Sequence, residues 1–358
     1  MSGTRHSRFC KNHHNFVVLL LLSWGLNVAA APLGMVSDNH SDRLSIFNAD
    51  LDIVTASLAA RPGMALGDCV VSADERTGIT TSSGGAITFI SLENGVMASD
   101  DNSDLDISNL GVDMALSPDD RFLVLAGGGA LQQPLSVVST ATREEIATSS
   151  PFADHTSVEF CDDGTLLVTT TQGKYFDWQV DNAMYDARLA QDGKVETLGH
   201  RLSSGARPNN ASCAPGSLSG VLLDRQGGLP SFTLPGLVPA QHVQLTSPEA
   251  IASVFSKDGR KLFIRTNNAL ESYHFNPVTG EMQRDWVRQM PETEPYYGID
   301  QIAIHPDGNK LYVDGGKAML IINPGDGAQL GEFSLGDTTG ICFANDPGAP
   351  VSAPIAMD

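Results

Sequence analysis

Polar residues recur just before short apolar segments of this chain, and their side chains are of types that can transfer protons or bind ligands. They are carboxylates, an imidazole, a phenol, amides and a hydroxyl, which act as general acids or bases and as hydrogen-bonding contacts. If the segments that follow surround one channel, these side chains converge at its mouth; the alternative is ordinary solvated loop residues. The candidate ligand-binding residues are Asp68, Asp113, His155, Asn209, Asn210, Glu249, Tyr297, Asp300 and Thr339.

Standard catalytic and cofactor motifs are absent from the sequence. It contains no GxSxG, no GxxxxGK[ST], no HExxH and no CxxCH. Among the candidates, Glu249, Asp300 and His155 have the chemistry of an acid or a base. The sequence therefore identifies no catalytic residue, no cofactor and no set of metal ligands.

The acidic run 100–106 places oxygen-bearing side chains at positions 100, 102, 104 and 106. This alternation resembles the first half of a calcium-binding loop. However, Leu105 occupies the position that needs glycine, and Gly111 the position that needs glutamate. We therefore predict a solvated acidic linker between repeats.

An internal repeat must position the candidate residues. The segments 114–126, 254–265 and 302–313 each contain an apolar strand, a polar turn and a second apolar strand. The turns contain Pro, Asp and Gly, which favour tight reversals. In the third turn we interpret His305 as a replacement for serine rather than as a metal ligand. Further strands are predicted after each pair, at 135–138 and 144–147, 270–275 and 282–288, and 318–322 and 329–334.

Weaker copies of the repeat bring the count to seven. Each repeat has a proline, or an equivalent residue, at the same place in its first turn. Successive residues at this place are 39 to 53 residues apart, about 45 on average. They are Ala73, Pro118, Asp162, Pro215, Lys257, Pro306 and Asn345. Four strands per repeat at this period are typical of a β-propeller. The sequence predicts an all-β, seven-bladed β-propeller; the alternative is a β-sandwich of unrelated hairpins.

The two ends of the chain are predicted to complete one blade. The last repeat has only its first strand, 339–344, whereas 44–48 and 52–56 form two strands that lack a first strand. N-terminal strands that complete the last blade would close the ring and cover its edges.

Residues 1–31 are typical of a secretory signal peptide. A basic start with Arg5, Arg8 and Lys11 precedes an apolar run, and Ala29 and Ala31 provide a cleavage site. The alternative, a membrane anchor, is disfavoured because the run is short for a hydrocarbon core of about 30 Å. The predicted organisation is a signal peptide at 1–31, a propeller at 32–346 and a Pro-rich tail at 347–358, in a secreted or periplasmic protein.

Four cysteines follow residue 31, and all are assigned to first strands. Export permits disulfides. Neighbouring blades meet through opposite sheet faces, so a bridge between them needs opposite strand parity. This pairs Cys161 with Cys213 and Cys69 with Cys342; the alternative is four buried thiols.

The stronger repeats resemble the YVTN-type propeller family, which includes lactonase-like proteins. The resemblance rests on Ser117-Pro118-Asp119, Ser256-Lys257-Asp258-Gly259 and His305-Pro306-Asp307-Gly308 and on the later turns 276–280 and 323–327. The namesake Tyr-Val-Thr-Asn is present only in altered form, beginning at Tyr312. The resemblance spans most of residues 44–346 and implies a fold, not an activity.

The charge of the chain limits its partners. With 42 acidic and 22 basic residues the net charge is −20, which argues against nucleic acid and anionic lipid as partners. After signal cleavage no membrane contact is predicted. The first hypothesis is a binding or scaffold protein that takes a small molecule or a protein at the channel mouth. The alternatives are a lactonase-like hydrolase or lyase and a propeller subunit of a periplasmic redox complex, so the residues leave open whether the chain is an enzyme.

Overall fold

The computed structural model places all its described residues in one compact unit, 31–358. The described residues are 32–38, 43–59, 66–74, 76–82, 85–93, 96–97, 103–106, 111–127, 135–147, 155–170, 182–203, 207–293, 301–335 and 340–343. The predicted signal peptide and C-terminal tail lie outside them. Within these residues no helix is long and apolar enough to cross a membrane.

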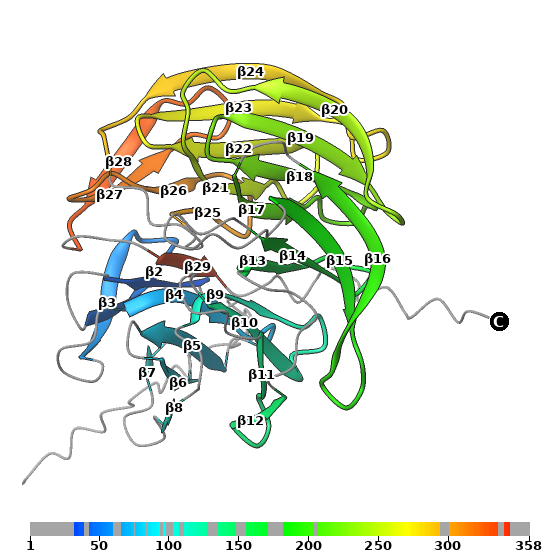
Figure 1. Cartoon of the computed structure of the whole chain (residues 1–358). Helices are drawn as coiled ribbons and strands as arrows, with labels where there is room; N and C mark the ends of the chain where they lie inside the picture. Colours follow the sequence, from blue (N-terminus) through cyan, green and yellow to red (C-terminus); the bar gives the residue numbers. More distant parts are fainter. Residues whose placement is uncertain are drawn as a thin grey trace, which may run out of the picture. The chain divides into compact units, whose positions relative to one another are not determined.

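Seven antiparallel sheets form the blades, as predicted (Figure 1). Blade 1 contains β4 (Leu66–Val71), β5 (Thr77–Ser82), β6 (Ala86–Glu93), β7 (Val96–Met97) and β8 (Ser103–Asp106). Blade 2 contains β9 (Gly111–Leu116), β10 (Phe122–Gly127), β11 (Ser136–Ser139) and β12 (Glu144–Ala147). The prediction of a linker at 100–106 is wrong for its second half, because residues 103–106 pair with β6 as an outer strand.

Blades 3 to 6 each contain four consecutive strands. Blade 3 contains β13 (His155–Phe160), β14 (Thr165–Thr170), β15 (Ala183–Leu189) and β16 (Val195–Ser203). Blade 4 contains β17 (Pro208–Cys213), β18 (Ser219–Asp224), β19 (Gly228–Thr233) and β20 (Val238–Gln244). Blade 5 contains β21 (Ala250–Phe255), β22 (Lys261–Thr266), β23 (Ala269–Phe275) and β24 (Met282–Gln289). Blade 6 contains β25 (Ile302–Ile304), β26 (Leu311–Asp314), β27 (Met319–Ile322) and β28 (Gln329–Phe333).

Blade 7 joins the two ends of the chain. Its order is β29 (Gly340–Phe343), β1 (Leu33–Ser37), β2 (Arg43–Asn48) and β3 (Ile53–Ala59), and Met35 of β1 lies opposite Cys342 of β29. The sequence located β2 and β3 but missed β1. This strand is buried at all five residues, so it lacks the alternation of polar and apolar residues by which a half-exposed strand is recognised.

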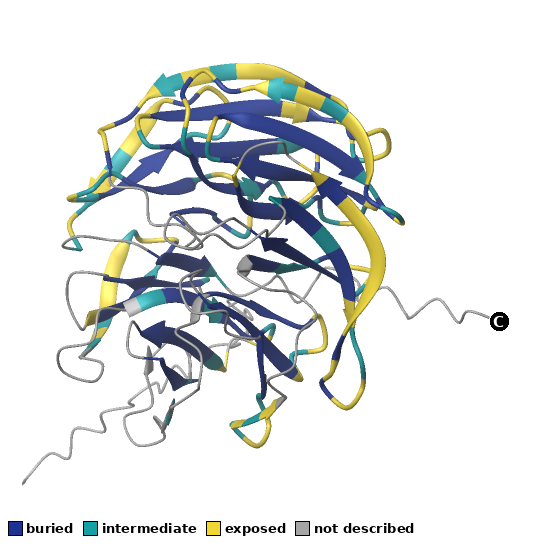
Figure 2. Ribbon diagram, viewed as in Figure 1, coloured by how far each residue is buried: buried dark blue, intermediate teal, exposed yellow. Residues whose placement is uncertain are grey.

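The first strand of each blade is its inner strand. Each inner strand contacts the next around the ring, in the order β4, β9, β13, β17, β21, β25, β29 and back to β4. Apolar clusters fill the spaces between blades; one joins Ala115 of blade 2 to Val158 of blade 3. The inner strands are largely buried, whereas β16, β20 and β24 at the rim are mostly exposed (Figure 2).

The turns after the inner strands have a common hydrogen-bonding pattern. In blade 2 the hydroxyl of Ser117 donates to Asp119 Oδ1 at 2.7 Å, and the same contact joins Ser256 to Asp258 at 2.6 Å in blade 5. In blade 6, His305 Nδ1 is 2.6 Å from Asp307 Oδ1. The imidazole therefore takes the place of the serine hydroxyl, as predicted.

Blade 6 holds the N-terminal hairpin of blade 7 through polar contacts. Lys310 Nζ is 2.8 Å from Asp52 Oδ2 and donates to the carbonyl of Ala49 at 3.0 Å. The hydroxyl oxygen of Tyr312 lies 2.6 Å from Asp52 Oδ1 and 2.8 Å from the same carbonyl oxygen, so its one hydrogen is shared between the two acceptors. His305 Nε2 lies 3.4 Å from Asp50 Oδ1. These contacts fix the turn between β2 and β3 against its neighbouring blade.

Two buried tyrosines predict a loss of stability in alkali. Burial, and then the hydrogen bond to Asp52, raises the pKa of Tyr312 above its usual value. Burial also raises the pKa of Tyr273, with Arg284 opposing and Glu271 adding to the shift. Their unfolded counterparts ionise near pH 10, so the free energy of unfolding should fall above that pH by up to about 1.4 kcal/mol per pH unit for each tyrosine.

Urea unfolding between pH 8 and 11 tests this expectation. The Tyr312→Phe variant should be about 1 kcal/mol less stable at pH 8, because it loses its hydrogen bonds, and its stability should fall less steeply above pH 10. Equal slopes for the variant and the wild type would contradict it.

Candidate functional site

The candidate residues that the structure describes lie at one end of the ring, where the inner strands begin; we call it the proximal end. Each turn after an inner strand has a position that is occupied by Ser117 in blade 2 and by His305 in blade 6. The residue four places before this position is polar in most of the described inner strands. These polar residues are Asp68, Asp113, Ser157, Asn210 and Gln301, and each is at most 6% exposed. The repeat thus places the same kind of side chain at one level in five blades.

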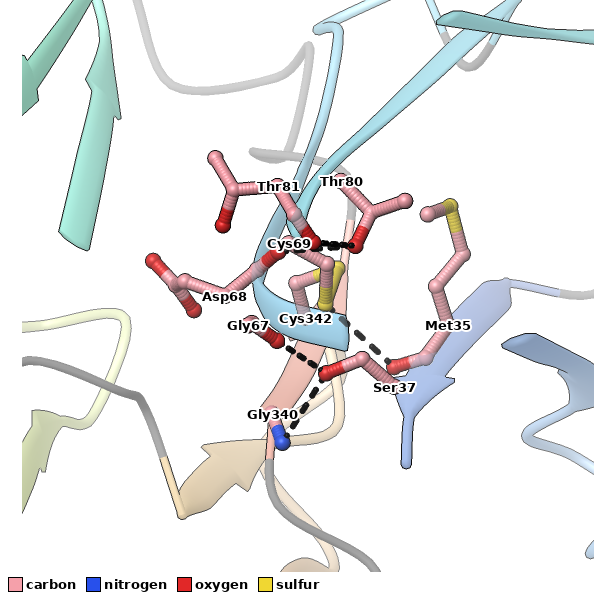
Figure 3. Close-up of a disulfide and its surroundings, with 9 residues drawn as sticks. All are labelled: Met35, Ser37, Gly67, Asp68, Cys69, Thr80, Thr81, Gly340 and Cys342. Carbon is pink, nitrogen blue, oxygen red and sulfur yellow. Dashed lines mark hydrogen bonds between the residues drawn. A yellow bond between two sulfur atoms is a disulfide. The ribbon is translucent and has the colours of Figure 1, made fainter. Parts of the chain in front are cut away.

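Two predicted carboxylates at this level are buried beside neighbouring strands. Asp113 Oδ2 accepts the backbone N–H of Val158 in the next blade at 2.9 Å. The carbonyl of Asp68 accepts the hydroxyl of Thr80 at 2.9 Å, and the Asp68 carboxylate projects away from the nearby disulfide (Figure 3). The contact of Asp113 ties blade 2 to blade 3, which is a structural role for a residue that the sequence offered as a ligand contact.

Asn209 and Asn210 are the second and third residues of β17, the inner strand of blade 4. The Asn209 side chain is fully buried, and its Nδ2 donates to the carbonyls of Ala250 at 3.1 Å and Ile251 at 2.9 Å in blade 5. This contact brings Asn209 beside the backbone that directly follows Glu249.

Glu249 is half-buried and has a φ of 64°, in the left-handed region that non-glycine residues seldom adopt. Its N–H donates to the carbonyl of Arg225 at 2.9 Å, and its carbonyl accepts the N–H of Asn267 at 3.3 Å. Asn267 Nδ2 donates to Glu249 Oε2 at 3.2 Å, and Ser247 Oγ donates to Asn267 Oδ1 at 3.1 Å. Both the backbone and the carboxylate of Glu249 are therefore held in place.

Several buried polar atoms at the proximal end have no hydrogen-bond partner. They are Thr81 Oγ1 in blade 1, Asn209 Oδ1 in blade 4, and both Nε2 and Oε1 of Gln301 in blade 6. Leaving such groups unpaired costs about 1–3 kcal/mol each. Sequence reasoning missed Thr81 and Gln301, although Gln301 occupies the same repeat position as Asp68 and Asp113.

The remaining candidates are only partly placed. His155 is the first residue of β13, and only its backbone is described. Tyr297, Asp300 and Thr339 lie outside the described residues. The structure therefore brings Asn209 beside the backbone that follows Glu249, where blades 4 and 5 meet. Asn210 is the next residue of β17, and Asp68 and Asp113 lie in other blades of the same ring.

Arg265 is a fully buried cation at the proximal end of β22. Its Nε donates to the carbonyl of Asp314 at 3.3 Å, and its Nη2 donates to the carbonyl of Pro291 at 2.9 Å and to Thr293 Oγ1 at 3.0 Å. Burial lowers the pKa of the guanidinium to about 10, with Asp314 opposing the shift. The side chain joins blade 5 to blade 6 and holds 291–293, just before the segment that carries Tyr297 and Asp300.

Replacing Arg265 with methionine should lower the free energy of unfolding by about 3 kcal/mol or more, because several carbonyl acceptors lose their donor in a buried site. The matched control is Arg188→Met. Arg188 is exposed and paired with Glu196, so its loss should change stability by no more than about 0.5 kcal/mol. Chemical denaturation measures both; equal effects would contradict the role given to Arg265.

The junction of blades 7 and 1 is held by a disulfide and by Ser37 (Figure 3). Cys69 and Cys342 are joined with a Cα–Cα distance of 5.8 Å, and Cys161 and Cys213 with one of 5.3 Å. These are the pairs that strand parity predicts. The hydroxyl of Ser37 donates to the carbonyl of Gly67 and accepts the N–H of Gly340, so it connects three strands beside Asp68.

The described residues point to no metal centre. Across the described residues, no group of three or more His, Cys, Asp or Glu side chains could hold a metal ion. An open groove of about 540 Å³ lies between blades 4 and 5, lined by residues that include Gln241, His274 and Met282. It adjoins the turn between β23 and β24, at the opposite end of the ring from the described candidates.

Comparison with solved structures shows a shared fold. A functionally unknown protein from Desulfotomaculum acetoxidans aligns with a TM-score of 0.76 and 18% identity, over 88% of this chain and 100% of that one. The periplasmic gluconolactonase of Pseudomonas aeruginosa aligns with a TM-score of 0.68 and 17% identity, over 88% and 99%. Hydrazine synthase of Kuenenia stuttgartiensis aligns with a TM-score of 0.61 and 11% identity, over 78% and 88%. The chain therefore has the fold of lactonase-like propellers.

Sequence comparison gives a narrower match. The family model of the eukaryotic translation initiation factor eIF2A matches residues 108–186, which cover much of blades 2 and 3. No curated protein matches the sequence.

Proposed function

We propose that this chain is an exported β-propeller that binds a ligand at the proximal end of its inner strands. The observation that carries the proposal is the set of buried, unpartnered polar groups of Thr81, Asn209 and Gln301. They come from three blades and share one end of the ring. Buried polar groups are normally hydrogen-bonded, and a ligand that reaches them would supply the missing partners.

Two further features support export. Residues 1–31 have the pattern of a secretory signal, and both disulfides belong to a class of bond that persists in oxidising compartments. The P. aeruginosa relative is described as periplasmic. We therefore propose a secreted or periplasmic location, with the propeller extending over 32–346.

The test is a thermal-shift screen of the mature protein with lactones, polyols, carboxylates and amines, followed by calorimetry. Gln301→Met should weaken binding of the selected compound at least tenfold. Without ligand it should also raise the free energy of unfolding by about 1 kcal/mol, because it removes an unpaired buried amide.

The matched control is Ser272→Ala. The hydroxyl of Ser272 is also buried without a partner, but it lies in the middle of β23. Its removal should leave binding unchanged. Binding that survives Gln301→Met, or a panel in which no compound binds, would count against the proposal.

A second candidate function is hydrolysis of a lactone at the same end. Its support is the fold shared with the gluconolactonase and the held carboxylate of Glu249, which has the chemistry of a general base. Release of acid from a lactone panel, with EDTA controls, tests it. Turnover that Glu249→Gln abolishes while lactone binding persists would establish an enzyme; binding without turnover would leave a binding protein.

A further inference from the structure

We infer that the junction of blades 4 and 5 binds a primary ammonium group, with Glu249 and Asn209 as its acceptors. This inference rests on the proposed function and adds the chemical class of the ligand. The site is built from two side chains that belong to neighbouring blades and are joined through the backbone of 249–251.

Asn209 presents an acceptor in a fixed orientation. Both hydrogen bonds of its Nδ2 go to carbonyl oxygens, those of Ala250 and Ile251. An exchange of the amide nitrogen and oxygen would set Oδ1 against these two carbonyls, so the orientation follows from the contacts. Oδ1 is buried and has no partner, and it accepts only from a donor that the ligand brings.

Glu249 supplies the negative charge. Its Oε2 is held by Asn267, and Asn267 is itself held by Ser247. Among the described residues, the carboxylate of Glu249 contacts the Asn267 amide and forms no ion pair with a lysine or arginine. The two carbonyls that hold the Asn209 amide belong to the residues that directly follow Glu249 in the chain. A carboxylate without a cation and an amide oxygen without a donor are each complementary to a group that is positively charged and carries several N–H donors.

The ammonium group fits this pair better than other classes of ligand. An anion would face the Glu249 carboxylate and the net charge of −20. A neutral hydroxyl offers one donor and no charge. A quaternary ammonium has the charge but no N–H for Asn209 Oδ1.

The experiment uses n-butylammonium as the probe, with 1-butanol, butyrate and tetramethylammonium for comparison, and measures binding to the full mature chain by NMR titration. We expect n-butylammonium to bind at least tenfold more tightly than each of the other three. Glu249→Gln should weaken its binding at least tenfold, because glutamine keeps the acceptor for Asn267 but removes the charge.

The matched control is Glu281→Gln, which changes an exposed carboxylate in the turn between β23 and β24. It should leave the affinity unchanged. Asn267→Ala provides a second variant that leaves Glu249 in place but unsupported, and it should weaken binding about threefold or more.

Equal binding of butanol or butyrate, or full affinity in Glu249→Gln, would overturn the ammonium inference. If polyols or lactones instead bind in a manner that depends on Gln301, the inference fails and the proposed binding function stands. If n-butylammonium binds through Glu249 but Gln301→Met has no effect, the ammonium site stands and the wider proximal-end proposal fails.

Discussion

Removal of residues 32–59 is expected to leave the rest of the chain unable to form a stable propeller. The deletion removes β1, β2 and β3, so β29 loses the strand with which it pairs. It also exposes the apolar clusters that contain Met35 and Phe47 at the two faces of blade 7. An uncovered strand edge beside an exposed core promotes aggregation.

Size-exclusion chromatography and thermal unfolding of the truncated protein measure this effect. The control removes residues 347–358, which follow the last inner strand, and should keep the melting temperature of the mature protein. A chain without 32–59 that remains monomeric and melts like the mature protein would refute closure by the N-terminal strands.

The second large effect is expected from the disulfide between Cys69 and Cys342. Replacing both cysteines with alanine should lower the free energy of unfolding by about 4–5 kcal/mol, because the bridge closes a separation of 273 residues in the unfolded chain. The Cys161–Cys213 bridge closes only 52 residues. Its removal should therefore cost about 1.5 kcal/mol less in chain entropy.

Denaturant unfolding of the two double variants compares these costs, and peptide mapping without reductant checks the pairing. Four alkylatable thiols in the oxidised, denatured protein would contradict both bridges. If the Cys161→Ala/Cys213→Ala variant loses more stability than the variant that lacks Cys69 and Cys342, loop length does not control the effect.

The strands of the propeller were predictable where the repeat alternates apolar runs with strong turns. The predicted fourth strand 144–147 coincides with β12, and the role of His305 followed from its place in the turn. The prediction failed for strands that are not set off by an alternation of apolar and polar residues or by a strong turn. β1 is buried along its whole length, and β8 is a short acidic strand that only its pairing with β6 identifies.

The candidate site was predictable in position but not in detail. The repeat brings polar residues to one end of the ring, and this is where Asn209 and Glu249 lie. The sequence does not show which polar groups find partners, because that depends on atoms of the next blade. The N–H of Val158 donates a hydrogen bond to the Asp113 carboxylate, whereas the side-chain amide of Gln301, at the equivalent position, has no hydrogen-bond partner.

The composite blade 7 also determines the order in which the molecule is completed. β1, β2 and β3 are synthesised first, but their inner strand β29 comes about 300 residues later. Pairs so distant in sequence form late, because the loop-closure entropy has to be overcome first. The ring therefore stays open until nearly the whole chain has been made, and the earliest strands wait the longest for their partner. A chain that crosses a membrane before it folds is already complete when folding begins, so late closure of the ring does not delay its folding.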